Sequence, residues 1–245
     1  MMHSSRGRLG LVVPTLNEAG NVPVLVERIR RALENTPLDY EIIFVDDDSQ
    51  DGTAAAVTQQ AQLDPRVRLF VRKGARGLAG AVIHGWENTQ ADFLGVIDAD
   101  LQHPPEVLPS LIDPLLNGAD IVIASRYISD NDSTKEWSKF RLFISRCGTL
   151  ATNLLQRKEV KIKDPLSGFF IVRRECIEGI RLQPEGFKIL LEILVKGRIR
   201  KAVEIPFRFG NRHSGKSKAD VRVALQYFTL LGKLSRHALF GPGQQ

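Results

Sequence analysis

The sequence is poor in cysteine and aromatic residues, and it contains no long apolar run. Its two cysteines, Cys147 and Cys176, cannot build a disulfide framework, so we expect a reducing compartment. No apolar run approaches the roughly 18 to 20 residues that cross a bilayer, and the first ten residues lack the apolar core of a signal peptide. We therefore expect a chain that neither spans a membrane nor is exported.

The overall composition is typical of a folded protein. Hydrophobic residues make up 43% and charged residues 25% of the chain, which excludes a disordered or fibrous protein. A length of 245 residues lies near the upper limit for one hydrophobic core. We expect a flexible N-terminus over residues 1–8, one folded domain over 9–237 and a disordered tail over 238–245.

The charges are divided unevenly along the chain. Residues 1–125 hold 10 Lys and Arg against 17 Asp and Glu, whereas residues 126–245 hold 24 against 11. The basic second half favours an anionic partner, such as nucleic acid, a phosphorylated ligand or an acidic lipid surface. Lysines that serve only solubility are the alternative.

Strands and helices alternate in the first half. Apolar runs predict strands over residues 9–14, 41–46, 67–71, 93–97 and 119–124, and helical spacing predicts helices over 21–33, 53–63, 79–89 and 106–116. This alternation indicates an α/β fold with a mostly parallel sheet and helices on both faces. Polar segments follow four strands, at residues 15–18, 46–48, 98–102 and 125–126. Because ligands bind beyond the carboxyl ends of such strands, we expect these segments to line one crevice.

The second half is less regular. We expect a loop over residues 129–135, a loop entering a strand over 164–172, an edge strand over 202–209 that contains Pro206, and a cation-rich loop over 210–218. Helices are expected over residues 139–156, 187–196 and 220–237.

Asp98, Asp100 and Gln102 form the most distinctive polar cluster. In an extended segment, residues two apart point to the same side, so three oxygen-bearing side chains would face one ligand. Such a set suits a hard divalent cation, which usually takes one or two carboxylates and completes its shell with water and phosphate oxygens. A solvated loop with two acids is the alternative.

Two other segments have groups suited to a nucleotide. Asp46–Asp48 places three carboxylates in a row, which a nucleobase could satisfy with its ring N–H groups, although Ser49 and Asp51 could simply cap the next helix. The glycines of residues 73–77 could let backbone N–H groups approach a phosphate. That segment is neither a P-loop nor a dinucleotide fingerprint, and a plain turn is the alternative.

Several cations of the second half are candidates for binding an anion: Arg126, Arg141, Arg212, Lys216 and Lys218. Arg126 follows a predicted strand, while Arg212 and Lys218 lie on a loop that could close over a ligand. Arginine binds phosphate oxygens as a bidentate fork and lysine as a point charge. Solvated surface cations are the alternative for each one alone.

Six motifs together resemble the family 2 glycosyltransferases with a GT-A fold, and within them the dolichol-phosphate (polyprenol-phosphate) mannose synthases. They are VVPTLNE (12–18), VDDDSQDGT (45–53), DADLQHPPE (98–106), ASRY (124–127), DPLSGFF (164–170) and RHSGKSK (212–218). The first three occur in many family 2 enzymes, whereas the combination of DADLQHPPE, the arginine of ASRY and the RHSGKSK loop is far more specific. The similarity covers nearly the whole chain.

The resemblance implies roles for the residues that match. The nucleotide site would be lined by Pro14, Leu16, Glu18, Val45 and Asp47. The diphosphate and an Mg²⁺ or Mn²⁺ ion would be bound by Asp98, Ala99, Asp100 and Gln102, with Asp98, Asp100 and Gln102 as metal ligands. The loop that closes on the donor would contribute Arg212 and Lys218, and the acceptor phosphate would be received by Arg126, Arg141 and Ser145. Arg126 would also contact the nucleotide sugar. Asp100, Arg126, Arg212 and Lys218 would act in catalysis. Leu16 departs from the family, whose members often carry tyrosine there.

The implied reaction is inverting transfer of mannose from GDP-mannose to dolichyl or polyprenyl phosphate. A phosphate monoester has a second pKa of about 6 and is already anionic near neutral pH, so no general base is required. The metal, Arg212 and Lys218 would stabilise the leaving nucleotide, while Arg126 and Arg141 orient the lipid phosphate. Residues 9–125 would form the nucleotide-sugar and metal half, and residues 126–237 the acceptor and membrane-interface half.

A lipid acceptor implies a peripheral protein at the cytoplasmic face of a membrane, with C-terminal amphipathic helices at the interface. Family members that lack transmembrane helices rely on partner subunits, so a self-sufficient enzyme, one with a membrane-anchoring subunit and a truncated chain are all consistent with the sequence. A UDP-glucose polyprenyl-phosphate glucosyltransferase is the alternative activity. A basic nucleic-acid-binding protein, suggested by a pI of about 9.5, is opposed by an aromatic content of 7% and by the absence of recognised nucleic-acid-binding motifs.

Overall fold

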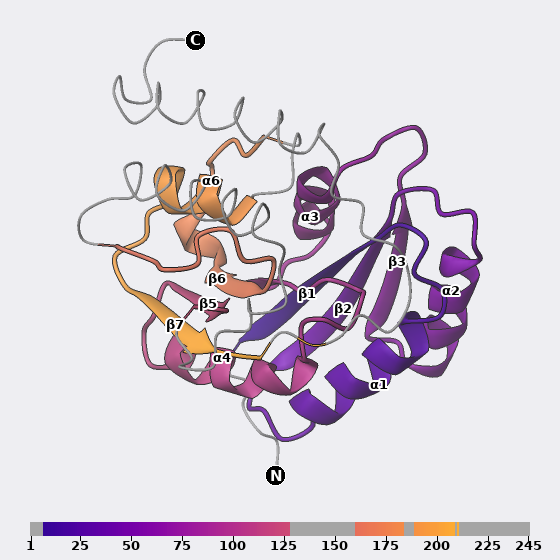
Figure 1. The fold of residues 1–245 in the computed structure, drawn as a ribbon, viewed down its shortest axis with the longest axis horizontal. Coiled ribbons are helices and arrows are strands. Elements are labelled where there is room, and N and C mark those ends of the chain that lie inside the picture. Colours follow the sequence, from indigo (N-terminus) through magenta and orange to yellow (C-terminus); the bar gives the residue numbers. More distant parts are fainter. Residues whose placement is uncertain (1–6, 128–159, 184–188, 209, 211–245) are drawn as a thin grey trace, which may run out of the picture.

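The computed structural model describes residues 7–127, 160–183, 189–208 and 210. Within them, seven strands form one sheet in the order β3-β2-β1-β4-β6-β5-β7 (Figure 1). The strands are β1 (Arg8–Thr15), β2 (Asp39–Asp46), β3 (Val67–Val71), β4 (Phe93–Val96), β5 (Ile121–Ser125), β6 (Phe170–Arg173) and β7 (Ala202–Pro206). The strand pairs are parallel except where β6 runs antiparallel to β4 and β5. The predicted mostly parallel sheet is confirmed.

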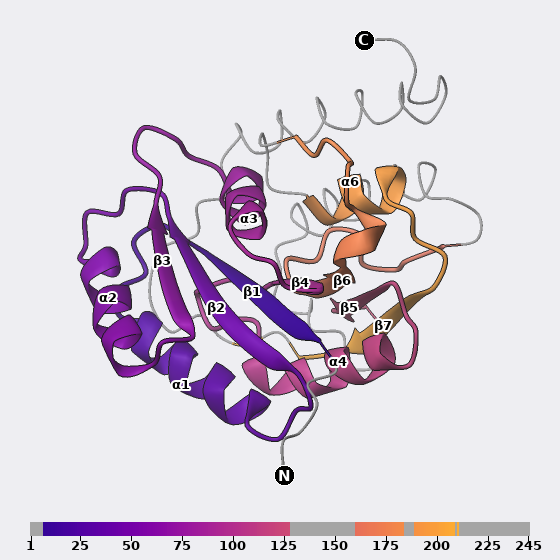
Figure 2. The same cartoon turned by 180° about the vertical axis from the view of Figure 1, so that it is seen from behind.

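Helices cover both faces of this sheet (Figures 1 and 2). They are α1 (Val22–Leu33), α2 (Thr53–Leu63), α3 (Leu78–Glu87), α4 (Leu108–Leu116) and α6 (Ile189–Lys196). Side chains of a strand alternate between the faces. Leu11 and Val13 of β1 therefore pack in the core beneath α1, α2 and α4, whereas Val12 packs in the core beneath α3 and α6. Both cores are fully buried at the sheet, so the strands read as continuous apolar runs.

The helix expected over residues 106–116 is split by its prolines. A 3₁₀ turn, η1 (Pro105–Val107), precedes α4, and the N–H of Leu108 donates to the carbonyl of Pro105. Pro109 has no N–H to donate to the same carbonyl four residues back, so the tighter turn replaces the first α-helical turn. A second 3₁₀ turn, η2 (Arg174–Cys176), follows β6.

The edge strand expected over residues 202–209 is confirmed as β7, which pairs with β5 alone and ends at Pro206. Other predictions fall outside the described residues: the loop over 129–135, the helices over 139–156 and 220–237, nearly all of the loop over 210–218, and most of both termini. None of the helices within the described part of the chain is long and apolar enough to cross a bilayer.

Candidate active site

The four polar segments predicted to share a crevice lie at one edge of the sheet. β1, β2, β4 and β5 run in the same direction, so their carboxyl ends lie on that edge. In the register of β1 and β2, Thr15 is opposite Asp46. β6 runs antiparallel to β4 and β5, so it begins at the edge where those strands end. Residues 164–169, which precede β6, therefore lie at the same edge.

Asp46 supports the ends of β1 and β2 and is fully buried. Its carboxylate accepts hydrogen bonds from Thr15 Oγ1 at 3.0 Å, from the N–H of Ser49 at 2.9 Å and from Ser49 Oγ at 2.5 Å. Ser49 therefore stabilises the carboxylate of Asp46 and does not cap the next helix. Asp51 does hold the start of α2, since its carboxylate accepts the N–H of Thr53 at 3.0 Å.

Asp47, expected at the nucleobase, is held on both of its oxygens and is only 5% exposed. Arg72 Nε donates to Oδ1 at 2.8 Å, and the N–H of Gly77 donates to Oδ2 at 2.8 Å. The N–H of Gly77 is thus directed at a carboxylate, which favours the plain turn over a phosphate-binding loop for residues 73–77. Arg72 orients Asp47 at the edge of the sheet, a role that local sequence patterns did not reveal.

The other residues expected at the nucleotide lie at the ends of β1 and β2. Pro14, Leu16 and Glu18 are all partly exposed there, and Glu18 accepts a hydrogen bond from Asn21 Nδ2 at 2.6 Å. Val45 differs, because its side chain is fully buried in the core beneath α3. Val45 therefore presents no exposed surface to a ligand.

The segment of residues 98–102 is a turn, so the expected extended geometry is wrong. Leu101 adopts a left-handed conformation with φ of 63°, and its side chain is buried. This turn allows Asp100 Oδ1 to accept the N–H of Gln102 at 3.1 Å. Asp98 remains 33% exposed, whereas Asp100 is 8% exposed and Ala99 3%. Asp98 is therefore the more accessible carboxylate of the cluster.

His103 packs directly behind this turn. Its Nδ1 lies 3.3 Å from Asp98 Oδ2, and its ring contacts those of Phe169 and Phe207, with centroids 5.5 and 5.6 Å away. Burial lowers the pKa of His103, although the charges of Asp98 and Asp100 act in the opposite direction. Burial outweighs the two carboxylates, so the neutral form of the imidazole is favoured.

The donor set of this turn fits a hard divalent ion. Among the described residues, no three His, Cys, Asp or Glu side chains gather into a metal site of their own. The turn instead offers two carboxylates and the amide oxygen of Gln102. Mg²⁺ and Mn²⁺ accept such oxygen donors and leave positions for water and for the phosphates of a substrate.

Arg126 is held by Asp164, a residue to which the sequence assigned no role. Arg126 Nε and Nη2 donate to the two oxygens of Asp164 at 2.8 and 2.7 Å, and the backbone N–H of Arg126 donates at 3.1 Å. The Asp164 side chain is 1% exposed and that of Arg126 is 15% exposed. Burial lowers the pKa of Arg126, but the hydrogen bonds and charge of Asp164 outweigh it and raise that pKa overall. Asp164 is the first residue of the DPLSGFF motif, and this motif was the only sequence feature that could have pointed to it.

Residues 164–168 connect Arg126 to the acidic turn. A Cβ atom added to Gly168 would lie 3.0 Å from Asp98 Oδ2, so the backbone passes directly beside that carboxylate. The charge of Asp98 also raises the pKa of Arg126. One short segment thus contains Asp164, the partner of Arg126, and passes beside Asp98, an expected metal ligand.

Gly210, two residues before Arg212 in the sequence, lies against the same turn. The N–H of Gly210 donates to the carbonyl of Gln102 at 2.8 Å, and Gln102 Nε2 lies 3.4 Å from the carbonyl of Gly210. Four of the expected site residues, Arg141, Ser145, Arg212 and Lys218, lie outside the described part of the chain. Their roles stay predictions.

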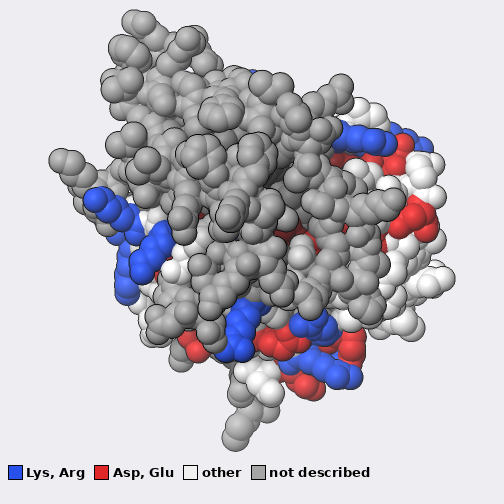
Figure 3. All heavy atoms as spheres, in the orientation of Figure 1, with Lys and Arg blue, Asp and Glu red and all other residues white. Residues whose placement is uncertain are grey.

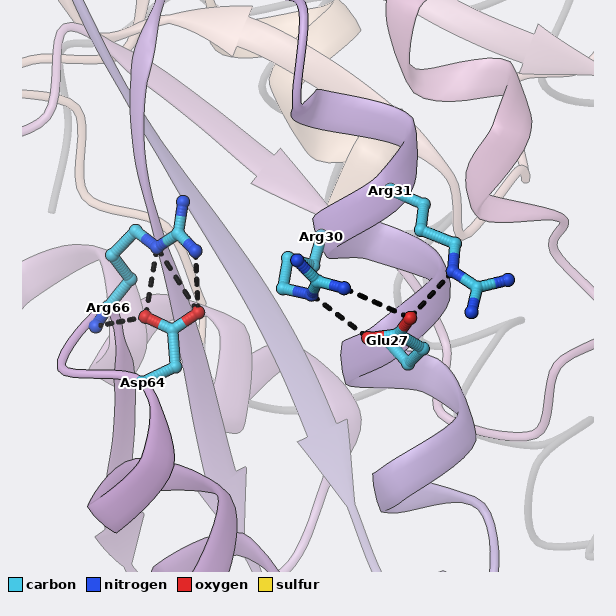
Figure 4. A network of polar contacts seen from close by, with 5 residues as sticks. All are labelled: Glu27, Arg30, Arg31, Asp64 and Arg66. Carbon is cyan, nitrogen blue, oxygen red and sulfur yellow. Dashed lines mark hydrogen bonds and ion pairs between the residues drawn. The ribbon is translucent and has the colours of Figure 1, made fainter.

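A cavity of about 760 Å³ lies at the opposite edge of the sheet, between α1 and the starts of β2 and β3. It is lined by four arginines: Arg8, Arg30, Arg66 and Arg68. Figure 4 shows two of them beside carboxylates: Arg30 pairs with Glu27, and Arg66 pairs with Asp64 at 2.7 Å. Arg68 likewise pairs with Glu41. These ion pairs compensate most of the positive charge of the cavity.

The described surface also mixes charges of both signs. On the face seen in Figure 3, Lys and Arg side chains lie beside Asp and Glu side chains in the lower and right-hand parts. A nucleic-acid-binding surface requires cations that gather on one face without such compensation. Lys and Arg side chains gather at the left of this face, whereas those in its lower and right-hand parts lie beside acids.

The sequence is similar to a protein family and to several known proteins. Residues 11–181 match the family described as Glycosyl transferase family 2. A dolichol-phosphate mannosyltransferase of Pyrococcus furiosus is 42% identical over 229 residues, which are 94% of this chain and 64% of that protein. Proteins of the same name from Saccharomyces cerevisiae and Mycosarcoma maydis are 35% and 34% identical, over 91% and 95% of this chain and 85% and 81% of their own lengths.

Solved structures share the fold at lower identity. A mannosyl-3-phosphoglycerate synthase from Rubrobacter xylanophilus has a TM-score of 0.70 and 21% identity, and the match covers 98% of this chain and 77% of that one. A glucosyl-3-phosphoglycerate synthase from Mycobacterium tuberculosis, solved with Mn²⁺, UDP-glucose and phosphoglyceric acid, has a TM-score of 0.67 and 19% identity, covering 96% of this chain and 81% of that one.

Proposed function

The chain belongs to glycosyl transferase family 2, and we propose that it transfers mannose from GDP-mannose to dolichyl or another polyprenyl phosphate. The arrangement that carries this proposal is the acidic turn of Asp98 and Asp100 beside the Arg126–Asp164 pair at one edge of the sheet. A transfer between two phosphate-bearing substrates needs such a combination, because one group holds the leaving diphosphate and the other receives the attacking phosphate. The relatives named dolichol-phosphate mannosyltransferase support the choice of sugar and acceptor.

The donor half of the reaction is assigned to the ends of β1, β2 and β4. Asp98, Asp100 and Gln102 would hold an Mg²⁺ or Mn²⁺ ion, and the Mn²⁺ in the glucosyl-3-phosphoglycerate synthase of the same fold supports a divalent metal. When bound, this ion supplies positive charge to the diphosphate oxygens as the glycosidic bond breaks. Asp47, fixed by Arg72, offers carboxylate oxygens to the base. Arg212 and Lys218 would close over the diphosphate.

The acceptor half is assigned to Arg126, together with Arg141 and Ser145. The planar guanidinium of Arg126 suits a phosphate and is fixed by Asp164. The lipid phosphate attacks in its ionised form, so the chain needs no residue to remove a proton. The lipid tail places the protein at a membrane surface, as a peripheral protein of the cytoplasmic face, with or without a membrane-anchoring subunit.

The test is transfer of radiolabelled mannose from GDP-mannose to a polyprenyl phosphate in detergent micelles, with Mn²⁺, Mg²⁺ or excess chelator. We expect metal-dependent product and a loss of about 100-fold or more for Asp100→Asn. Asp113→Asn, which removes an exposed carboxylate of α4, is the matched control and should be fully active. UDP-glucose is run in parallel. Transfer of glucose alone would replace the proposed donor, and no transfer from either donor would reject the function.

A further inference from the structure

The Arg126–Asp164 pair is held in turn by a third charged residue, Glu204 of β7. The two oxygens of the Glu204 carboxylate accept two consecutive backbone N–H groups: Oε2 from Lys163 at 2.9 Å and Oε1 from Asp164 at 3.0 Å. A carboxylate that bridges two adjacent amides fixes the direction of the backbone at that point. Glu204 of β7 therefore sets the orientation of the backbone to which the Asp164 side chain is attached.

The strand pairing makes this support rigid. Glu204 is opposite Ile123 in the parallel register of β5 and β7, and β5 ends at Ser125, directly before Arg126. Arg126 follows β5 and Glu204 lies in β7, so two paired strands hold both ends of the contact chain that runs from Arg126 through Asp164 to Glu204. Ser167 fastens the far side of the segment, because its Oγ donates to the carbonyl of Ala124 at 2.7 Å.

We propose that Glu204 is a positioning residue for the acceptor phosphate: it fixes Asp164, which fixes the guanidinium of Arg126. This inference rests on the proposed function, in which Arg126 receives the lipid phosphate. Asp164 sets the orientation of the guanidinium through Nε and Nη2, and an arginine binds phosphate well only in a narrow range of orientations. A small rotation of Asp164 therefore weakens phosphate binding. Loss of Glu204 acts mainly on the acceptor site, because Thr15, Ser49 and Arg72 hold the carboxylates at the end of β2 without it. The part of the segment that passes beside Asp98 is held separately, by the hydrogen bond of Ser167 to Ala124.

The test measures the two substrates separately. Glu204→Gln retains the length of the side chain but replaces one acceptor oxygen by an NH₂ group, which opposes one of the two backbone N–H groups. We expect the KM for polyprenyl phosphate to rise about tenfold, as for other supporting residues around a site, and the KM for GDP-mannose to stay within about twofold. Glu178→Gln, an exposed change of the same kind, should alter neither KM.

A double-mutant cycle separates positioning from a general loss of structure. Asp164→Asn removes one oxygen that binds Arg126, and we expect kcat/KM for the lipid phosphate to fall about 100-fold. If Glu204 acts through Asp164, the double variant is no worse than Asp164→Asn alone, because both changes affect one unit. If Glu204 serves only the stability of β7, the two losses multiply, and the inference is wrong.

The remaining outcomes are also decisive. An equal rise of both KM values in Glu204→Gln, or no rise at all, overturns the inference while the proposed function stands. Absence of mannose transfer by the unchanged protein rejects the proposed function and this inference with it. If Glu204→Gln does not fold, Glu204→Asp keeps the charge with a shorter reach, and the same comparison of the two KM values applies.

Discussion

Gly168→Ala probes how closely the backbone of the DPLSGFF segment approaches the turn of residues 98–102, which we propose binds the metal. The added Cβ would lie 3.0 Å from Asp98 Oδ2 and 3.3 Å from Oδ1, whereas ordinary contacts begin at 3.4 Å. The segment itself is fastened by Ser167 and by the fully buried Phe169. The Asp98 side chain, 33% exposed, is therefore the part that moves.

The structure predicts a large effect on activity and a small effect on stability. A rotation of Asp98 toward solvent relieves the contact at a cost of about 1 kcal/mol or less, because it leaves the packed core intact. A displaced catalytic group loses far more, since a misplacement on the order of 1 Å can cost about 100-fold in rate. We expect a 10- to 100-fold loss of mannose transfer, with a higher Mn²⁺ concentration needed for half-maximal rate.

The assay is a Mn²⁺ titration of the transfer rate, accompanied by urea unfolding. Gly10→Ala is the matched control, because its Cβ would lie 3.1 Å from Ala91 Cβ near the start of β1, at the end of the strands opposite to the turn. That variant should lose stability and keep the Mn²⁺ dependence of the unchanged protein. Normal rate and normal Mn²⁺ dependence in Gly168→Ala would show that Asp98 is not constrained as described.

Three further predictions concern the fold around the site. Gly85→Ala should destabilise the protein, because its Cβ would lie 2.6 Å from Val12 Cγ2. The overpacking cost of about 1–3 kcal/mol exceeds the helix-propensity gain of about 1 kcal/mol. If Val12→Ala does not reduce the destabilisation caused by Gly85→Ala in urea unfolding, the prediction is wrong. Because burial lowers the pKa of His103, its neutral form stabilises the fold above about pH 6.5, and this contribution is lost as the pH falls below that value. The unfolding free energy of His103→Gln should therefore fall less steeply between pH 7 and 5 than that of the unchanged protein. Equal slopes would refute this prediction. Burial raises the pKa of Cys176 to about 11, so in Cys147→Ala the remaining thiol should react with iodoacetamide at pH 7.5 much more slowly than a free cysteine, and rapid alkylation of the folded protein would be inconsistent with its environment.

Several parts of the site could not be predicted from sequence because their contacts join distant residues. Asp164 lies 38 residues from Arg126, and Glu204 lies 40 residues from Asp164. Arg72 reaches Asp47 across 25 residues. Spacing rules describe only neighbours in the chain, so Arg126 was recognised without its partner Asp164, and Asp47 without its partner Arg72.

The sequence alone determined the features that depend on local periodicity and on strand direction. Apolar runs and helical spacing place β1 to β5 and α1 to α4 within a few residues, and the parallel direction of the strands brings Asp46, Asp98 and Arg126 to one edge. Only the tertiary structure decided that β6 enters antiparallel between β4 and β5. That reversal carries Asp164 and Gly168 to the same edge, where one fixes an arginine and the other leaves room for a carboxylate. Sheet order depends on how whole faces pack against helices, and no short stretch of sequence contains that information.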